Sequence, residues 1–253
     1  MMLNVRLYFL YWVLFLGFPL YEVNAQGIVW EKEWGFSVND DQIYKVCAST
    51  DGNYLAIGGS SKFGGNVGGG SYPGLVVIKF TPEGDTIFMK KLNVLGHVIS
   101  YLGHKYGNLF RVVFTTPRPG IGSYRFGVIE FTDNGFILQT KVFEDLGNRQ
   151  IMSCTQTPDL GLILAGSGVG GGLMSAVKLN FLNELEWEYG YFPPVSVSGM
   201  ANRIEPMANG NYLISGRLGK RIYGIEIDTA GNQIAQKQFY ETPSNYVFWD
   251  AKA

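Results

Sequence analysis

The chain has 253 residues, of which 46% are hydrophobic and only 16% are charged, and its formal net charge at pH 7 is −1. A net charge this close to zero gives no electrostatic attraction to nucleic acid or to an anionic membrane, so we expect no nucleic-acid partner. The 34 glycines occur among many β-branched and aromatic residues, without a sustained 3.6-residue apolar period, which predicts an all-β fold.

The N-terminal 25 residues have the composition of a secretory signal peptide. Arg6 precedes an apolar run over residues 7–20, and Ala25 ends a short stretch of the kind that signal peptidase cleaves. The alternative is a transmembrane anchor, but a helix needs about 20 apolar residues to cross the hydrocarbon core, more than this run offers. We therefore expect residues 1–25 to be removed, a secreted or cell-surface location, and no stable membrane span afterwards.

Four copies of one pattern occupy most of the remaining chain. The repeats cover residues 41–92, 97–143, 149–192 and 200–240, and a partial copy follows at 245–253. Each copy has four strand-like segments and two tight turns rich in Gly and Asn, such as Asp51-Gly52-Asn53, which favour hairpins. A period of about 50 residues is typical of propeller-type arrays.

The repeat predicts a four-stranded antiparallel meander. One such sheet leaves both of its faces exposed, so the copies must stack as blades. Residues 28–34 look like the last strand of a further, partial N-terminal copy. We thus expect residues 26–253 to form a β-propeller-like array of about four complete repeats, as an open or truncated ring. Either the chain is a fragment of a longer product, which we favour, or the last blade is reduced to two strands.

Two positions of the repeat stand out from their neighbours. The third strand has one charged position, which we expect to face solvent: Lys79, Glu130, Lys178 and Glu226. The last strand has an aromatic position, which we expect to pack between blades: Trp30, Phe88 and Trp187.

The two cysteines, Cys47 and Cys154, occupy the first strands of copies 1 and 3. Because these copies are not consecutive, a disulfide is possible only across a narrow central axis, where the Cα atoms could come within about 7 Å. We expect two buried free thiols instead.

No catalytic, cofactor or metal constellation is predicted. Residues 166–172 contain a G-x-G-x-x-G match, but a strand-like segment follows it where a dinucleotide site requires a helix, so we interpret it as an interstrand loop. His97 and His104 lack metal-ligand spacing and are interpreted as polar surface residues. Asp40 and Asp41 lack the alternating oxygen ligands of a calcium loop.

The longer loops, at residues 59–73, 116–124, 167–173 and 217–221, are expected to gather at one end of the blades. Loops on a rigid scaffold commonly carry recognition. We therefore predict a cationic and aromatic binding rim, suited to glycans with acidic groups or to an acidic partner protein: Lys62, Phe63, Tyr72, Arg118, Tyr124, Arg217, Lys220 and Arg221. The alternative is an ordinary solvated rim.

The segments DGNYLAIGGS at 51–60 and VIKFTPEGDTIF at 77–88 resemble the secreted β-propeller-like repeat proteins that bacteria export by type IX secretion. AVKLNFLNELEW, at 176–187, is the most similar to the second half of that repeat, and the resemblance covers nearly all of residues 28–253. It implies a surface location and usually a C-terminal sorting domain, which is not visible here. The same half resembles, more poorly, the tryptophan-docking repeats of quinoprotein propellers, and nothing supports a bound quinone.

We expect a secreted, non-enzymatic repeat protein that acts as a binding or scaffold module at the cell surface, with an extracellular glycan or protein as partner and no cofactor. The alternative is a propeller-type carbohydrate-active enzyme, a lyase or hydrolase, with its site on the long-loop face. That enzyme would need two carboxylates or a Tyr–His pair there. A third interpretation is a structural segment of a longer, active protein.

Overall fold

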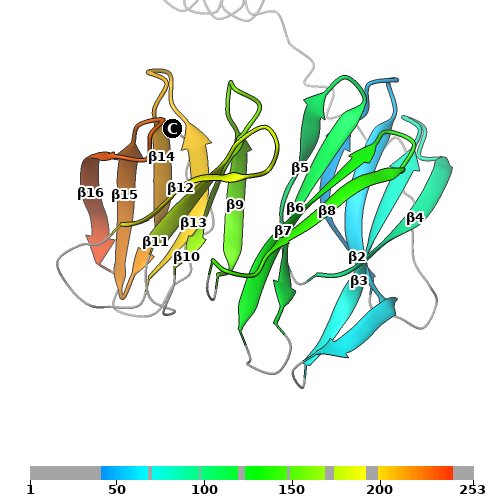
Figure 1. The fold of residues 1–253 in the computed structure, drawn as a ribbon, viewed down its shortest axis with the longest axis horizontal. Helices are drawn as coiled ribbons and strands as arrows, with labels where there is room; N and C mark the ends of the chain where they lie inside the picture. Colours follow the sequence, from blue (N-terminus) through cyan, green and yellow to red (C-terminus); the bar gives the residue numbers. More distant parts are fainter. Residues whose placement is uncertain are drawn as a thin grey trace, which may run out of the picture. The chain divides into compact units, whose positions relative to one another are not determined.

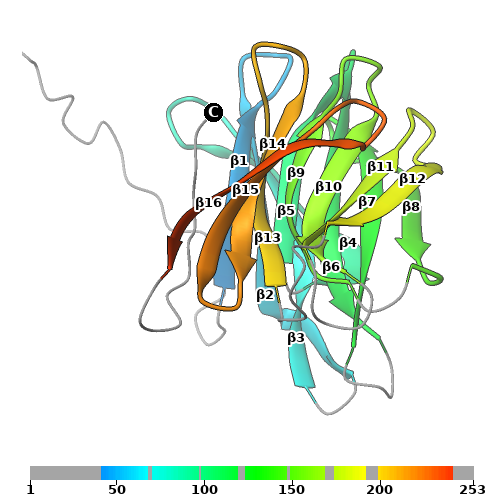
Figure 2. The same cartoon turned by 90° about the vertical axis from the view of Figure 1, so that its left-hand side faces the viewer.

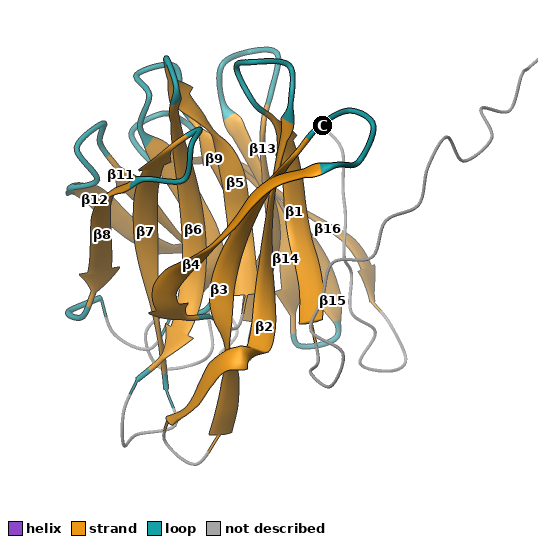
Figure 3. Ribbon diagram, turned by 90° about the vertical axis from the view of Figure 1, so that its right-hand side faces the viewer, coloured by secondary structure: helices purple, strands orange, loops and turns teal. Residues whose placement is uncertain are grey.

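The computed structural model describes residues 41–67, 70–96, 98–118, 123–146, 149–168, 174–191 and 199–241. These residues form strands β1 to β16 and connecting turns, and none of them is helical (Figure 3). Among them, accordingly, no helix is long and apolar enough to cross a membrane. The predicted signal peptide at 1–25, the strand at 28–34 and the partial copy at 245–253 lie outside the described residues.

Four antiparallel sheets, named here blades 1 to 4, follow one another along the chain (Figure 1). Blade 1 consists of β1 (Asp41–Ala48), β2 (Tyr54–Val67), β3 (Gly70–Phe80) and β4 (Thr86–Leu95). Blade 2 consists of β5 (Val98–Tyr106), β6 (Leu109–Pro117), β7 (Tyr124–Thr132) and β8 (Ile137–Phe143). Blade 3 consists of β9 (Ile151–Gln156), β10 (Leu162–Ser167), β11 (Met174–Leu179) and β12 (Leu185–Tyr191). Blade 4 consists of β13 (Gly199–Pro206), β14 (Tyr212–Leu218), β15 (Arg221–Ile227) and β16 (Gln233–Glu241).

Each blade is a meander of consecutive strands, which confirms the predicted all-β, propeller-like array. The first strands lie next to one another: β1 contacts β5, β5 contacts β9, and β9 contacts β13 (Figure 2). The region in which these four first strands meet is called the axial end of the blades below.

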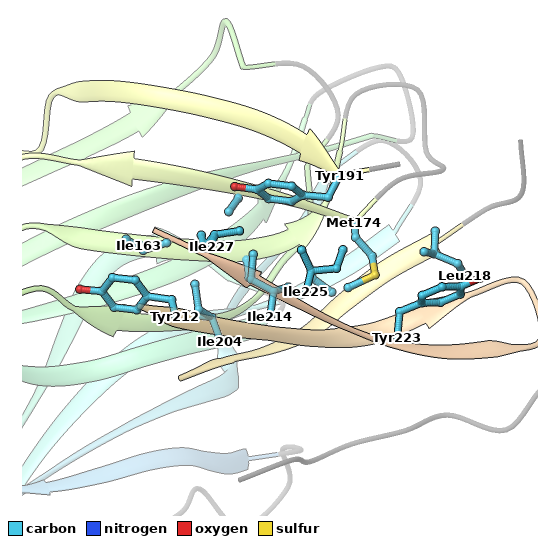
Figure 4. Packing of buried hydrophobic residues seen from close by; sticks show 13 residues of the cluster. Ile163, Met174, Tyr191, Ile204, Tyr212, Ile214, Leu218, Tyr223, Ile225 and Ile227 are labelled. Atoms are coloured by element: carbon cyan, nitrogen blue, oxygen red, sulfur yellow. The ribbon is translucent and has the colours of Figure 1, made fainter. Parts of the chain in front are cut away.

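A hydrophobic cluster fills each space between consecutive blades. The residues of β10 alternate between two of these clusters. Leu162 and Leu164 pack with blade 2, whereas Ile163 and Ala165 pack with blade 4 in the cluster shown in Figure 4. The middle strands are apolar at nearly every position because both of their faces are covered, and stacking therefore provides the core that one sheet lacks.

The pairing of each first strand with the second strand of its blade includes a register shift, or β-bulge. This bulge brings the first strand close to the second, which explains why three blades have a glycine at this position of the second strand. A Cβ atom on Gly58 would lie 2.5 Å from the carbonyl oxygen of Gln42, and Gly166 and Gly216 have the same close approach to the first strand. Phe114 occupies this place in blade 2, as the register opposite Ile99 shows.

The first tight turn of each blade places one residue at positive φ, as the Asp-Gly and Asn-Gly pairs predict. Gly52 has φ +84° and Gly210 has φ +85°. In blade 3, Leu160 (φ 62°) holds this conformation in the first turn, and Asn183 (φ 59°) holds it in the second.

The aromatic position of the last strand docks on the second turn of the next blade. Phe88 of blade 1 packs against Gly135, where a Cβ atom would lie 2.8 Å from the ring. Trp187 of blade 3 packs against Gly231, and its indole Nε1 donates to the carbonyl oxygen of Thr229 at 3.3 Å. Both rings also pack on the hydrophobic clusters, which confirms the interblade prediction for them; Trp30 lies outside the described residues.

The prediction that the charged position of the third strand faces solvent was wrong for three of its four residues, whereas Glu226 is half-buried. Lys79, Glu130 and Lys178 are only 5%, 7% and 3% exposed. The physical reason is that turns cover this end of the third strand and supply the counter-charge. The ammonium of Lys79 lies 2.7 Å from Asp51 in its own first turn and 3.7 Å from Asp133 in the second turn of blade 2.

In blade 2 the charged residue of the third strand, Glu130, belongs to a group of hydrogen bonds that holds blade 2 to blade 3 and is called the clamp below. Arg111, fully buried, donates from Nε to Oε1 of Glu130 at 2.9 Å, and from its two Nη atoms to the carbonyl oxygens of Leu160 and Phe181 at 2.6 Å each. Asn183 also donates to Glu130, at 2.8 Å. Burial raises the pKa of Glu130, but hydrogen bonds from Lys105, Arg111 and Asn183 outweigh it and hold that pKa below its usual value.

Both cysteines are free thiols, as predicted, but they are partly buried where full burial was expected. Cys47 packs on the cluster between blades 1 and 2, and Cys154 on the cluster between blades 2 and 3. Burial raises the pKa of Cys47 to about 11. These thiols therefore contribute to packing and are poor nucleophiles.

Candidate functional site

The long-loop end is more regular than the sequence indicated. The predicted loop at 59–73 is mostly an extension of β2 and β3, in which Gly65 pairs with Tyr72. The predicted loop at 217–221 is a tight hairpin, because Leu218 pairs with Arg221 and Gly219 turns the chain at φ 57°. Glycine in these segments permits close strand pairing and tight reversal, where the composition was interpreted as loop.

The β2–β3 extension carries a small cation–π group. The ammonium of Lys62 lies 5.8 Å from the centroid of the Phe63 ring, and that of Lys91, from β4, lies 5.6 Å from the same ring. Two predicted rim residues, Lys62 and Phe63, thus lie together with a second cation, Lys91, that was not predicted from the sequence. The negative face of the aromatic ring attracts both ammonium groups electrostatically.

Two tyrosines join the ends of blades 1 and 2. Tyr124, at the start of β7, makes a side-chain hydrogen bond with Tyr72 of β3. Burial, followed by this hydrogen bond, raises the pKa of Tyr124. Both residues were predicted to lie on the rim, and the structure brings them into contact.

A pocket of about 390 Å³ opens beside this contact in blade 1. Its lining consists of small, polar and aromatic residues: Asp41, Gln42, Tyr44, Gly59, Ser61, Ser71, Tyr72 and Pro73. The Tyr44 hydroxyl lies 3.0 Å from the place of a Cβ atom on Gly59, so this glycine leaves room for the tyrosine. Aromatic rings beside carboxylate, amide and hydroxyl groups can stack on one face of a polyol and bond its edge.

An arginine pair lies at the same end of blade 2. Arg118 donates to the carbonyl oxygen of Glu144, and Arg125 donates to the Glu144 carboxylate. The ion pair with Arg125 holds the pKa of Glu144 below its usual value. Among the described residues, the Nε atoms of both arginines and the hydroxyl of Ser123 are buried without a hydrogen-bond partner. The two arginines carry one positive charge more than the Glu144 carboxylate with which they interact.

The remaining predicted residues, Arg217, Lys220 and Arg221, lie on the β14–β15 hairpin of blade 4. The predicted rim is therefore divided into a group on blades 1 and 2 and a basic hairpin on blade 4.

The described histidine does not build a metal or catalytic site. His104 is exposed on β5, contacts the carbonyl oxygen of Gly107, and lies edge-on to Phe110 at 5.4 Å. Within the described part of the chain, no three His, Cys, Asp or Glu side chains are grouped so that they could hold a metal ion. His97 and Asp40 lie outside the described residues.

A cavity of about 210 Å³, which was not predicted from the sequence, lies at the axial end of the blades. All four first strands line it: Lys45 from β1, Ser100, Tyr101 and Leu102 from β5, Ser153, Cys154 and Thr155 from β9, and Arg203, Ile204, Glu205 and Pro206 from β13. The hydroxyl residues of copies 2 and 3 indicated that these first strands are polar, but the convergence of all four first strands depends on the stacking and the bulges.

Stacked four-stranded blades with polar openings at their ends define a propeller-like repeat protein. No protein-family model and no curated protein matches the chain. Among solved structures, it is similar to a protein of unknown function from Dyadobacter fermentans DSM 18053, with a TM-score of 0.50 and 12% identity. The match covers 79% of this chain and 65% of that one, so the chain spans about two thirds of its neighbour's length. At this identity the likeness shows the fold alone.

Proposed function

We propose that this protein is a secreted, non-enzymatic binding module that holds an extracellular glycan at the long-loop end of blades 1 and 2. The observation that carries the proposal is the pocket of about 390 Å³ with Tyr44, Tyr72 and Asp41 in its lining, beside the Tyr72–Tyr124 contact. Export through a signal peptide rests on the residue pattern of the N-terminal 25 residues, and membership of the type IX secretion group rests on the sequence resemblance.

The chemistry of this end suits a carbohydrate. Tyrosine rings present apolar faces that stack on the C–H surface of a sugar ring, while Gln42 and Ser71 offer hydrogen bonds to hydroxyl groups. The excess positive charge of Arg118 and Arg125 over Glu144 favours a sugar with an acidic group nearby. A protein partner remains the alternative occupant of the same surface.

The enzyme alternative requires two carboxylates or a Tyr–His pair at this end. Among the described residues that line the pocket, Asp41 is the one carboxylate. A hydrolase built on acid and nucleophile roles needs a second carboxylate within about 5–10 Å. The lining therefore supports binding better than hydrolysis.

The test uses the secreted chain on a glycan array, followed by titration with the best ligand. We expect Tyr72→Ala and Arg118→Ala each to weaken binding about tenfold, which corresponds to ~1.4 kcal/mol for a lost stacking or charged contact. Lys220→Ala, on the hairpin of blade 4, is the matched control and should change little. Release of shortened products from any bound glycan would overturn the non-enzymatic assignment, and equal loss in all three variants would place the site elsewhere.

A further inference from the structure

We propose that the axial cavity is a second ligand site, separate from the long-loop pocket, and that it binds a small molecule with one carboxylate group. The proposal stands on the convergence of side chains from the four first strands. It does not depend on the glycan proposed for blades 1 and 2.

The positive charge of the site comes from β1. Lys45 pairs in register with Ile57, whose side chain faces blade 2 in the interblade cluster. Residues directly opposite in an antiparallel pair lie on the same face, so Lys45 also projects toward β5 and the cavity. Among the described residues the Lys45 ammonium has no ion-pair or hydrogen-bond partner, and it lines the cavity as a cation.

Two hydroxyl donors come from β9. Ser153 and Thr155 are two positions apart, and so lie on the same face of this strand. The Ser153 hydroxyl accepts a hydrogen bond from the backbone N–H of Ile204 at 3.2 Å, which leaves its own proton to donate. Within the described part of the chain, the Thr155 hydroxyl makes no hydrogen bond, so a ligand oxygen can accept from it.

The opposite wall limits the ligand to one negative charge. Arg203 of β13 donates from Nε to Oε1 of Glu205 at 2.7 Å, so these two charges neutralise each other. Together, Lys45, Arg203 and Glu205 leave a single positive charge in the lining of the cavity. A carboxylate matches this charge and offers two acceptor oxygens, whereas a phosphate dianion would be left half neutralised.

The size and the apolar part of the lining define the rest of the ligand. About 210 Å³ holds about seven water molecules at ~30 Å³ each, and so accommodates a molecule no larger than a single sugar acid. Leu102, Ile204 and Pro206 supply an apolar wall for its carbon skeleton. The ligand class is therefore a small hydroxy-carboxylate such as a hexuronate.

The test is an NMR or calorimetric titration of the secreted chain with glucuronate and acetate, and with glucose and acetamide as their uncharged counterparts. We expect saturable binding of the carboxylates alone, with shifts at the backbone amides around Lys45 and Ser153. Lys45→Gln should weaken glucuronate binding at least tenfold, and Thr155→Val about threefold. Lys237→Gln, a lysine on exposed β16, is the matched control and should leave the affinity unchanged.

Lys45 is exposed, so Lys45→Gln should fold normally, and an unchanged melting temperature checks this. Absence of carboxylate binding, equal binding of glucose, or binding that survives Lys45→Gln would each overturn the proposal. Tyr72→Ala, which tests the long-loop pocket, should not alter glucuronate titrations at the axis. The two sites can therefore fail independently.

Discussion

Single residues in the tight turns determine how readily the backbone reverses between two strands. Gly52 turns the chain at φ +84°, and a Cβ atom there would meet no other atom within 4 Å. Gly52→Ala should therefore cost about 1–2 kcal/mol, purely from the left-handed backbone conformation. We expect the urea midpoint to fall accordingly, with an unchanged m-value.

Blade 3 provides the reverse experiment, because Leu160 already holds φ 62°. In Leu160→Gly, relief of backbone strain offsets the greater freedom of the unfolded chain, so we expect a change of within about 0.5 kcal/mol. A loss from Leu160→Gly as large as that from Gly52→Ala would show that side-chain contacts of Leu160, and not its backbone, dominate this turn.

The buried charged position of the third strand also makes stability depend on pH. Burial raises the pKa of Asp159, but hydrogen bonds from Lys178, Thr157 and Gly161 lower it to about 2 in the folded state. The unfolded value is about 3.9. Because the folded pKa is depressed, this stabilisation is complete above about pH 5 and is lost as the pH falls through 4 toward 2.

We therefore expect the free energy of unfolding to be flat near neutral pH and to decline below pH 4, and Asp159→Asn to reduce that decline. A carbon-detected NMR titration of Asp159 measures the pKa directly. In Lys178→Met the pKa should rise, since the ammonium 2.8 Å from Asp159 is removed; an unchanged value would contradict the ion-pair explanation.

At the scale of elements, Arg111 holds blade 2 to blade 3 through two carbonyl oxygens and Glu130. In blade 1 the corresponding residue is Leu55, which pairs with Lys79. Arg111→Leu introduces this residue type, but it leaves the three acceptors buried without the guanidinium. We expect a loss of about 2–4 kcal/mol by urea unfolding.

Arg111→Lys is the matched control, because it keeps the charge but not the planar fork. A lysine cannot reach both carbonyls and Glu130 together, so its loss should be intermediate. Equal stability of Arg111→Leu and the unchanged chain would show that the clamp contributes nothing.

The strands and turns could be predicted from the sequence because their determinants are local. Asp-Gly and Asn-Gly pairs set the reversals, and apolar runs such as residues 162–167 set the covered strands. The burial of Lys79 and Glu130 could not be predicted, since Asp133 and Asn183, in turns of the next blade, complete their surroundings. Arg111 was missed because its carbonyl acceptors, at Leu160 and Phe181, belong to blade 3.

For the whole molecule, part of the candidate site could be predicted and part could not. Tyr72 and Tyr124, both assigned to the rim from the sequence, lie in contact, since alternate hairpins of a meander point the same way. Arg217 and Lys220 were grouped with them, although they lie in blade 4. The axial cavity was missed because Lys45, from copy 1, meets residues of the other three copies only after stacking.

Stacking also determines how far along the array a single mutation lowers the stability. Each blade shares hydrophobic clusters with its neighbours in the chain, so stability should be a sum of blade terms and nearest-neighbour interfaces. Ile214, buried between blades 3 and 4, and Ile57, buried between blades 1 and 2, are matched in type and burial. Ile214→Ala and Ile57→Ala should each cost about 2–5 kcal/mol locally.

Native-state hydrogen exchange shows whether each mutation destabilises only the blades beside its interface or the whole array. Ile214→Ala should accelerate amide exchange in blades 3 and 4 while β2 and β3 keep most of their protection, and Ile57→Ala should do the reverse. The reason is that opening one interface leaves the next one, with its own cluster, intact. Uniform acceleration over all four blades in both variants would contradict nearest-neighbour coupling, because it would mean that the blades open only as one cooperative unit.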